Sequence, residues 1–134
     1  TKVVYTKQGA EKNFVIVDAA MNDIARPSLY GSYHALKPVK DTGASEITAD
    51  VVGGICESGD FLAKDRIISE PKPGDLLAVM SAGAYGFSMS SNYNSRPRAA
   101  EVMADGSTFH VIREREKLVD LVRGEKLIRG KKRK

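Results

Sequence analysis

The chain is poor in the residues that build disulfides and metal centres. Its 134 residues include one cysteine, two histidines and no tryptophan. One cysteine cannot form an internal disulfide, and one cysteine with two histidines gives no ligand spacing for zinc, so we expect neither kind of site. The sequence also lacks an apolar run near the ~18 residues of a membrane helix, and a charged-then-apolar leader. We therefore expect a cytoplasmic protein with no membrane partner.

The residues that are present have the composition of one soluble globular domain. Hydrophobic residues make up 42% of the chain and charged residues 28%, which is ordinary for such a domain. The first residue is Thr1 and not methionine, and a strand pattern begins at Val3. We expect that a longer polypeptide precedes this chain.

The net charge of +4 comes from the carboxyl-terminal end. Residues 113–134 contain ten Lys or Arg and four Asp or Glu, whereas residues 1–112 contain eleven and thirteen. The final Lys131-Lys132-Arg133-Lys134 has no aromatic residue among its charges. We expect residues 125–134 to form a basic, disordered tail and not a nucleic-acid arm, so no nucleic-acid partner is expected.

Most of the chain has the alternating pattern of β-strands. Segments rich in Val, Ile, Phe or Ala lie between turn residues, at 3–6, 13–18, 46–56, 75–80, 99–103 and 108–113. Asp105-Gly106-Ser107 joins the last two as a hairpin. A helix is expected at 114–123, packed against the strands. The pattern predicts a mainly β fold, a small β-barrel or sandwich of about six to eight strands with a C-terminal helix.

Within segment 46–56, apolar Ile47, Ala49 and Val51 alternate with polar Thr48 and Asp50. This alternation predicts a half-buried strand. The following Gly53-Gly54 pair suits a bulge or a bend that redirects the chain after it, and with it Cys56.

The single cysteine lies in a polar stretch, Ile55-Cys56-Glu57-Ser58-Gly59-Asp60. Cys56 could be a small buried packing residue, or a neutral thiol that acts as a general acid between two carboxylates. A cysteine protease would need a histidine partner, and neither His34 nor His110 has recognisable surroundings. Tyr85, in Gly83-Ala84-Tyr85-Gly86, follows a second strand and could join Cys56 and Glu57 at the strand ends.

Two further polar segments could carry chemistry. The segment from Met21 to Gly31 reads as a loop in which Arg26 and Tyr30 could offer a guanidinium and a phenol to one carboxylate. A structural salt bridge is the alternative for Arg26. The segment 88–98 is rich in polar groups and is expected to be a surface loop.

Four motifs, in order, resemble the carboxy-terminal domain of diaminopimelate decarboxylases. These enzymes belong to the pyridoxal-phosphate decarboxylases of alanine-racemase-like fold, with ornithine and arginine decarboxylases. The motifs are Asp18-Ala19-Ala20-Met21-Asn22-Asp23 with Arg26-Pro27-Ser28-Leu29-Tyr30-Gly31, Cys56-Glu57-Ser58-Gly59-Asp60, Gly83-Ala84-Tyr85-Gly86 and Ser91-Asn92-Tyr93-Asn94-Ser95-Arg96-Pro97. The resemblance reaches about Leu121.

The resemblance implies a two-domain subunit in a homodimer whose active sites use both subunits. Residues 1–124 would be the C-terminal β domain. An amino-terminal (β/α)₈ barrel, absent from this chain, would carry the lysine that binds pyridoxal 5'-phosphate. No lysine of this chain is expected to face a cofactor, and Lys64, just after the cysteine motif, is expected at the surface. The chain alone is expected to be inactive.

The resemblance also implies roles for individual residues in converting meso-2,6-diaminopimelate to L-lysine and CO2. Cys56 would donate a proton to the product and Glu57 would bind a substrate ammonium group. Arg26 and Tyr30 would hold the distal carboxylate, and Tyr85 would contact the cofactor phosphate and the substrate. An ornithine- or arginine-type decarboxylase, and a non-enzymatic β-barrel module that binds nucleic acid through its basic end, are the alternatives.

Overall fold

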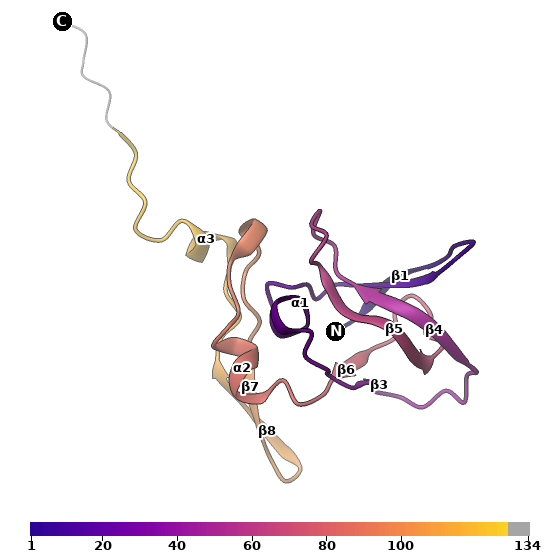
Figure 1. The fold of residues 1–134 in the computed structure, drawn as a ribbon. Coiled ribbons are helices and arrows are strands. Elements are labelled where there is room, and N and C mark those ends of the chain that lie inside the picture. The colour runs from indigo at the N-terminus through magenta and orange to yellow at the C-terminus, as the bar shows by residue number, and fades with distance from the viewer. Residues whose placement is uncertain (129–134) are drawn as a thin grey trace, which may run out of the picture.

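A computed structural model describes residues 1–128 and is mainly β (Figure 1). Its strands are β1 (Val3–Gln8), β2 (Asn13–Val17), β3 (Leu36–Pro38), β4 (Glu46–Val52), β5 (Phe61–Ser69), β6 (Leu77–Val79), β7 (Glu101–Asp105) and β8 (Thr108–Arg113). Its helices are α1 (Arg26–Tyr30), α2 (Gly83–Phe87), α3 (Leu118–Leu121) and a 3-10 turn, η1 (Tyr93–Ser95). The expected mainly β fold of six to eight strands is confirmed.

The strands form three sheets. The largest has the order β1-β2-β4-β5, with β2 and β4 parallel and the outer pairs antiparallel. Strands β3 and β6 form an antiparallel pair, and so do β7 and β8. Within residues 1–128 these sheets stay open and do not close into a barrel. The expected 105–107 hairpin is confirmed, because Asp105 pairs with Thr108 around Gly106, whose φ is 57°.

The hydrophobic core lies between the four-stranded sheet and the β3-β6 pair. Val15, Val51 and Leu62 are almost completely buried at its centre. The other buried members are Val3, Val17, Ile24, Leu36, Ala49, Ala63, Ile68 and Leu77. This core fixes the ends of β4 and β5, and therefore the loop between them.

Strand β4 is shorter than the sequence predicts, and β5 was missed. The predicted strand 46–56 ends at Val52, and the chain then turns before β5 begins at Phe61. The apolar pattern of β5 is interrupted by Lys64-Asp65-Arg66, with Asp65 at a positive φ of 48°. This interruption hid the strand from a search for regular alternation.

The expected outward position of Asp50 is also wrong. Asp50 is only 6% exposed, because the register of β4 against β5 shifts at Ala49–Val51 and again at Val51–Val52. Its carboxylate accepts hydrogen bonds from the Lys12 ammonium at 3.0 Å and from the Asp65 backbone N–H at 2.6 Å. The register irregularity therefore lies inside β4, and Gly53-Gly54 marks the predicted bend at its end and not a bulge.

The predicted helix at 114–123 shortens to the four residues of α3 and does not pack against the sheets. Glu116 forms an ion pair with Arg98 at 2.8 Å, and residues 114–117 are not helical. Leu118 and Val119 are 72% and 67% exposed. The apolar residues of this segment have helical spacing. The ion pair between Glu116 and Arg98, however, is made with residues 114–117 in a non-helical conformation.

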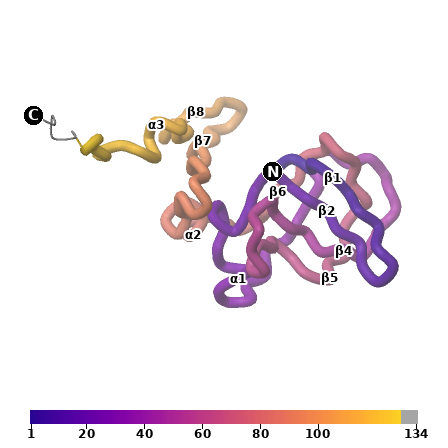
Figure 2. The backbone as a smooth tube through the Cα atoms, turned by 90° about the horizontal axis from the view of Figure 1, so that it is seen from above, coloured from indigo at the N-terminus to yellow at the C-terminus, as the bar shows by residue number. Residues whose placement is uncertain are grey.

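Figures 1 and 2 place α2, α3 and the β7-β8 hairpin to one side of the four-stranded sheet, with α1 at the end of the sheet that faces α2.

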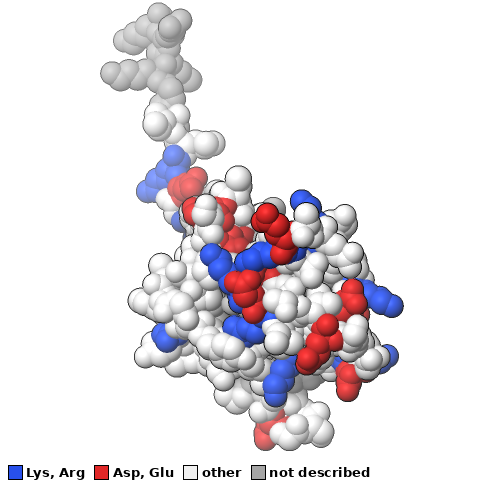
Figure 3. All heavy atoms as spheres, turned by 45° about the vertical axis from the view of Figure 1, so that its right-hand side comes forward, with Lys and Arg blue, Asp and Glu red and all other residues white. Residues whose placement is uncertain are grey.

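On the face drawn in Figure 3, basic and acidic side chains are intermixed. No helix in residues 1–128 has the length and apolarity to cross a membrane. The predicted tail at 125–134 extends beyond these residues, and Lys131-Lys132-Arg133-Lys134 lies outside the described part.

Candidate functional site

The loop between β4 and β5 presents Cys56 and Glu57 to solvent. The thiol of Cys56 is exposed, so the packing alternative for this residue is wrong. Asp60, at the far end of the loop, is 5% exposed. Its two oxygens accept the backbone N–H groups of Met21 and Ile55, both at 2.7 Å. Asp60 therefore holds the loop closed, and of the two expected carboxylates only Glu57 is presented beside the thiol.

Gly53 is required at the start of this loop by the close approach of Asp60. A Cβ atom at this position would lie 2.5 Å from Asp60 Oδ2 and 2.7 Å from the Ala20 Cβ atom. Adjacent Gly54 is open, with no heavy atom within 4 Å of the same position. Gly53 thus allows the bend after β4 to pack closely against Asp60 and Ala20.

We predict that Gly53→Ala lowers the free energy of unfolding by about 1–3 kcal/mol, because the new methyl overlaps a buried carboxylate and Ala20. Gly54→Ala is the matched control and should change stability by less than about 0.5 kcal/mol. Urea unfolding of the full-length protein measures both. Equal effects at the two positions would show that the loop does not pack as described.

Helix α1 positions Arg26 and Tyr30, where the sequence predicted a loop. Pro27 lies in its first turn with a φ that suits a helix, and Gly31 ends it at a φ of 62°. Pro27 and Asn22-Asp23 predicted a loop, but Asn22-Asp23 precede the helix and Pro27 lies in its first turn. A spacing of four residues places Arg26 and Tyr30 on the same helical face.

The Arg26 guanidinium lies beside two tyrosine rings. Its central carbon is 5.6 Å from the ring centre of Tyr30 and 4.8 Å from that of Tyr85 on α2. No carboxylate in residues 1–128 forms an ion pair with Arg26, so the salt-bridge alternative finds no partner there. Tyr30 and Tyr85 are 65% and 56% exposed. The cluster therefore offers a cation and two phenols to an anion from outside the domain.

Glu57 is held by Tyr93, a residue that the sequence analysis did not select. The Tyr93 hydroxyl donates a hydrogen bond to Glu57 Oε2 at 3.2 Å. This hydrogen bond and the negative charge of Glu57 raise the pKa of Tyr93 above its ordinary value of 10.0. Tyr93 belongs to segment 88–98, which was expected to be only a surface loop. Its presence in the motif Ser91-Asn92-Tyr93-Asn94-Ser95-Arg96-Pro97 was the available signal.

Glu57 and Tyr93 lie near helix α1. They line a cavity of about 300 Å³ together with Leu29 of α1 and Ala25, the residue before the helix. The structure therefore brings Tyr85 to Arg26 and Tyr93 to Glu57, and the cavity that contains Glu57 and Tyr93 borders α1.

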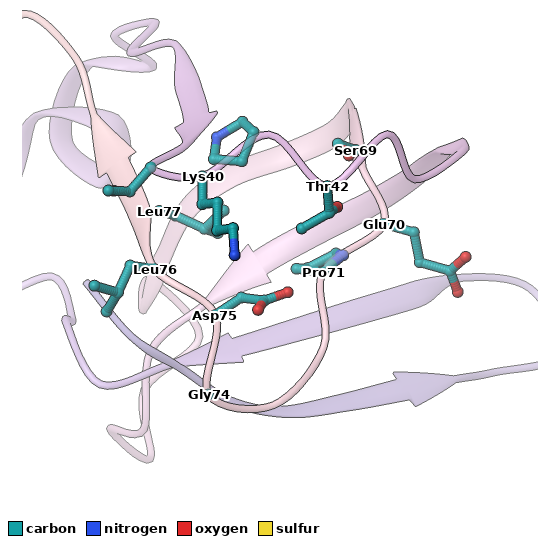
Figure 4. A pocket seen from close by; sticks show the side chains of 11 residues that line it. Lys40, Thr42, Ser69, Glu70, Pro71, Gly74, Asp75, Leu76 and Leu77 are labelled. Atoms are coloured by element: carbon teal, nitrogen blue, oxygen red, sulfur yellow. The ribbon is translucent and has the colours of Figure 1, made fainter.

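A second cavity, of about 230 Å³, lies away from all five predicted site residues (Figure 4). Its walls include Lys40, Thr42 and Leu77, from the ends of the β3-β6 pair and nearby turns. Asp75 in its wall accepts the Lys72 backbone N–H at 2.8 Å and so closes the turn around Gly74. This cavity belongs to the packing of the sheet ends and not to the candidate site.

Comparison with known proteins identifies the class. Residues 1–83 match the family described as the pyridoxal-dependent decarboxylase, C-terminal sheet domain. The chain therefore belongs to this family. A viral arginine decarboxylase from Paramecium bursaria Chlorella virus, at 14% identity and a TM-score of 0.63, shares the fold alone.

Much closer relatives are diaminopimelate decarboxylases. Those of Neisseria meningitidis and Pseudomonas aeruginosa are 57% and 54% identical over 118 and 128 residues, which cover 88% and 96% of this chain. The chain spans only 29% and 31% of their lengths.

Two solved structures of diaminopimelate decarboxylases are also similar to this chain. The diaminopimelate decarboxylase of M. jannaschii has a TM-score of 0.89 at 36% identity, over 95% of this chain and 29% of that chain. The Helicobacter pylori enzyme complexed with L-lysine has a TM-score of 0.84 at 47% identity, over 91% of this chain and 30% of that chain.

Proposed function

We propose that residues 1–124 form the C-terminal β domain of a cytoplasmic diaminopimelate decarboxylase, which converts meso-2,6-diaminopimelate to L-lysine and CO2. The observation that supports this substrate is the Arg26 guanidinium, which lies between Tyr30 and Tyr85 with no ion-pair partner in residues 1–128. The 57% identity to the Neisseria meningitidis enzyme supports the same substrate.

Arg26 and Tyr30 bind the distal carboxylate of the substrate. A guanidinium presents paired N–H donors that match the two oxygens of a carboxylate, and the phenol adds a third donor. Ornithine and arginine have no carboxylate at the distal end, so they would leave the guanidinium without a partner. Rejection of such substrates by a site built for a charged group is strong.

Pyridoxal 5'-phosphate is the cofactor of the full-length protein, and its lysine lies outside this chain. The phosphate end of the cofactor suits Tyr85, because this exposed phenol can donate a hydrogen bond to a phosphate oxygen. When bound, the cofactor accepts the electrons of the bond that breaks as CO2 leaves. This chain by itself is inactive because it lacks the cofactor lysine.

Cys56 and Glu57 act at the reacting end of the substrate. The exposed thiol donates a proton to the carbon that has lost CO2, and the Glu57 carboxylate binds a substrate ammonium group. In the homodimer, the β4–β5 loop delivers both side chains to the cofactor site of the second subunit.

The test is CO2 release by the purified full-length protein with pyridoxal phosphate, offered meso-diaminopimelate, L-ornithine and L-arginine separately. We expect kcat/KM for meso-diaminopimelate to exceed the other two by at least about 10³-fold. A preference for ornithine or arginine would contradict the substrate assignment while leaving the family unchanged. No release from any of the three would contradict the decarboxylase itself.

A further inference from the structure

Both oxygens of Glu57 accept hydrogen bonds, although the side chain is at the surface. Oε2 accepts the Tyr93 hydroxyl at 3.2 Å, and Oε1 accepts the Gly59 backbone N–H at 3.2 Å. A free glutamate samples many rotamers, so two donors from separate segments select one orientation. Each oxygen still has a second lone pair, which can accept a hydrogen bond from an ammonium group.

Tyr93 itself is fixed in a turn that has an unusual backbone conformation. Asn94 and Ser95, which follow it, have positive φ angles of 57° and 55°. Left-handed conformations are uncommon outside glycine, and asparagine adopts them more readily than most residues, so Asn94 and Ser95 define a specific turn. Hydrogen bonds on both sides of this turn hold it as a support for the Tyr93 ring.

One side of the turn is attached to the domain through Asn22. Asn22 is only 2% exposed. Its backbone carbonyl accepts a hydrogen bond from the Ser91 backbone N–H at 2.9 Å. The Ser91 hydroxyl oxygen then accepts the Tyr93 backbone N–H at 3.3 Å. The position of Tyr93 thus follows from a buried residue just before α1.

The other side of the turn is attached through Asn92. Its side-chain N–H groups donate to the Arg96 carbonyl at 3.0 Å and to Glu116 Oε2 at 2.6 Å. Hydrogen bonds from Arg98 lower the pKa of Glu116 to about 2, so this carboxylate stays ionised at neutral pH. Both ends of the turn are held by hydrogen bonds that do not involve the Tyr93 ring.

We propose that Tyr93 is a positioning residue for Glu57, which it holds by its hydroxyl in the orientation that receives the substrate ammonium group. The inference rests on the proposed function of Glu57. The hydroxyl is the only atom of Tyr93 that this role requires, because the turn keeps its form without it. Tyr93 does not touch the reacting carbon in this role and acts through the carboxylate.

The first test is Tyr93→Phe in the full-length holoenzyme. It removes one hydrogen bond to a charged acceptor, so we expect KM for meso-diaminopimelate to rise roughly 5- to 10-fold, with kcat changed less than about 2-fold. Tyr5→Phe is the matched control, since Tyr5 is a 60% exposed tyrosine on β1. Equal KM values in the two variants would overturn the proposal.

A double-mutant cycle separates positioning from a general structural effect. In a Glu57→Ala background, Tyr93→Phe should change KM by less than about 2-fold, because the side chain on which Tyr93 acts is gone. The same 5- to 10-fold rise in both backgrounds would mean that Tyr93 acts independently of Glu57, which overturns the proposal.

A titration of tyrosinate absorbance in the same full-length proteins does not depend on turnover. Glu57→Gln should lower the pKa of one phenol, and this change should be absent when Tyr93 is Phe. No change on Glu57→Gln would overturn the pairing even in an active enzyme. A full-length protein with the expected titration but no activity on meso-diaminopimelate would contradict the proposed function and keep the pairing.

Discussion

Arg26→Ala should lower kcat/KM for meso-diaminopimelate by roughly 10³-fold in the full-length enzyme. The substitution removes the guanidinium beside Tyr30 and Tyr85, which we propose binds the distal carboxylate of the substrate. The bound substrate would then place a carboxylate in a site without a cation. Steady-state CO2 release measures the loss.

The loss should be a loss of recognition and not of folding. Arg26 forms no ion pair within residues 1–128, so its removal should cost less than about 1 kcal/mol of stability. Arg123→Ala is the matched control, because the Arg123 side chain is 79% exposed and forms an ion pair with Asp120 of α3, outside the cluster of Arg26, Tyr30 and Tyr85. Wild-type turnover by a folded Arg26→Ala enzyme would contradict the role of Arg26.

Cys56→Ala should lower kcat by roughly 10²-fold, with little change in cofactor binding. The thiol is exposed in the β4–β5 loop and is the one group there that we assign to proton transfer. Without it, solvent must supply the proton to the carbon that has lost CO2. Reaction in D2O should then place deuterium with less stereochemical control in the product lysine.

The control for Cys56→Ala is Ser58→Ala, an exposed residue of the same loop. It should keep wild-type kcat and deuterium placement. If Cys56→Ala shows the wild-type rate and the wild-type product, Cys56 is not the proton donor.

The strands and turns of the sheet could be predicted because their causes are local. The alternation in β2 and the 105–107 turn of the β7-β8 hairpin depend on residues next to each other in sequence. The buried place of Asp50 could not be predicted, because its partners Lys12 and Asp65 come from the turn before β2 and from β5. Strand β5 was missed for a different, local reason, because Lys64-Asp65-Arg66 interrupts its apolar pattern.

Some site residues could be predicted from the sequence and others could not, depending on whether their signal is local in the chain. Arg26, Tyr30 and Cys56 belong to compact motifs, so the resemblance could select them from the sequence. Tyr93 lies 36 positions from Glu57 and meets it only through tertiary structure. Gly53 was predicted at a bulge or a bend, and only the positions of Asp60 and Ala20 explain why it must lack a Cβ atom.

We infer that this domain completes an active site whose cofactor lysine belongs to the other subunit. This inference is tested by coexpressing full-length Cys56→Ala subunits with subunits in which the upstream cofactor lysine is replaced, and purifying the mixed dimers. Each parent dimer lacks one essential group, whereas a mixed dimer regains one complete site. We predict that the purified mixed dimers have about half of the wild-type activity, because one of their two sites is complete. Mixed dimers no more active than their parents would show that each site uses its own Cys56, and would contradict the account.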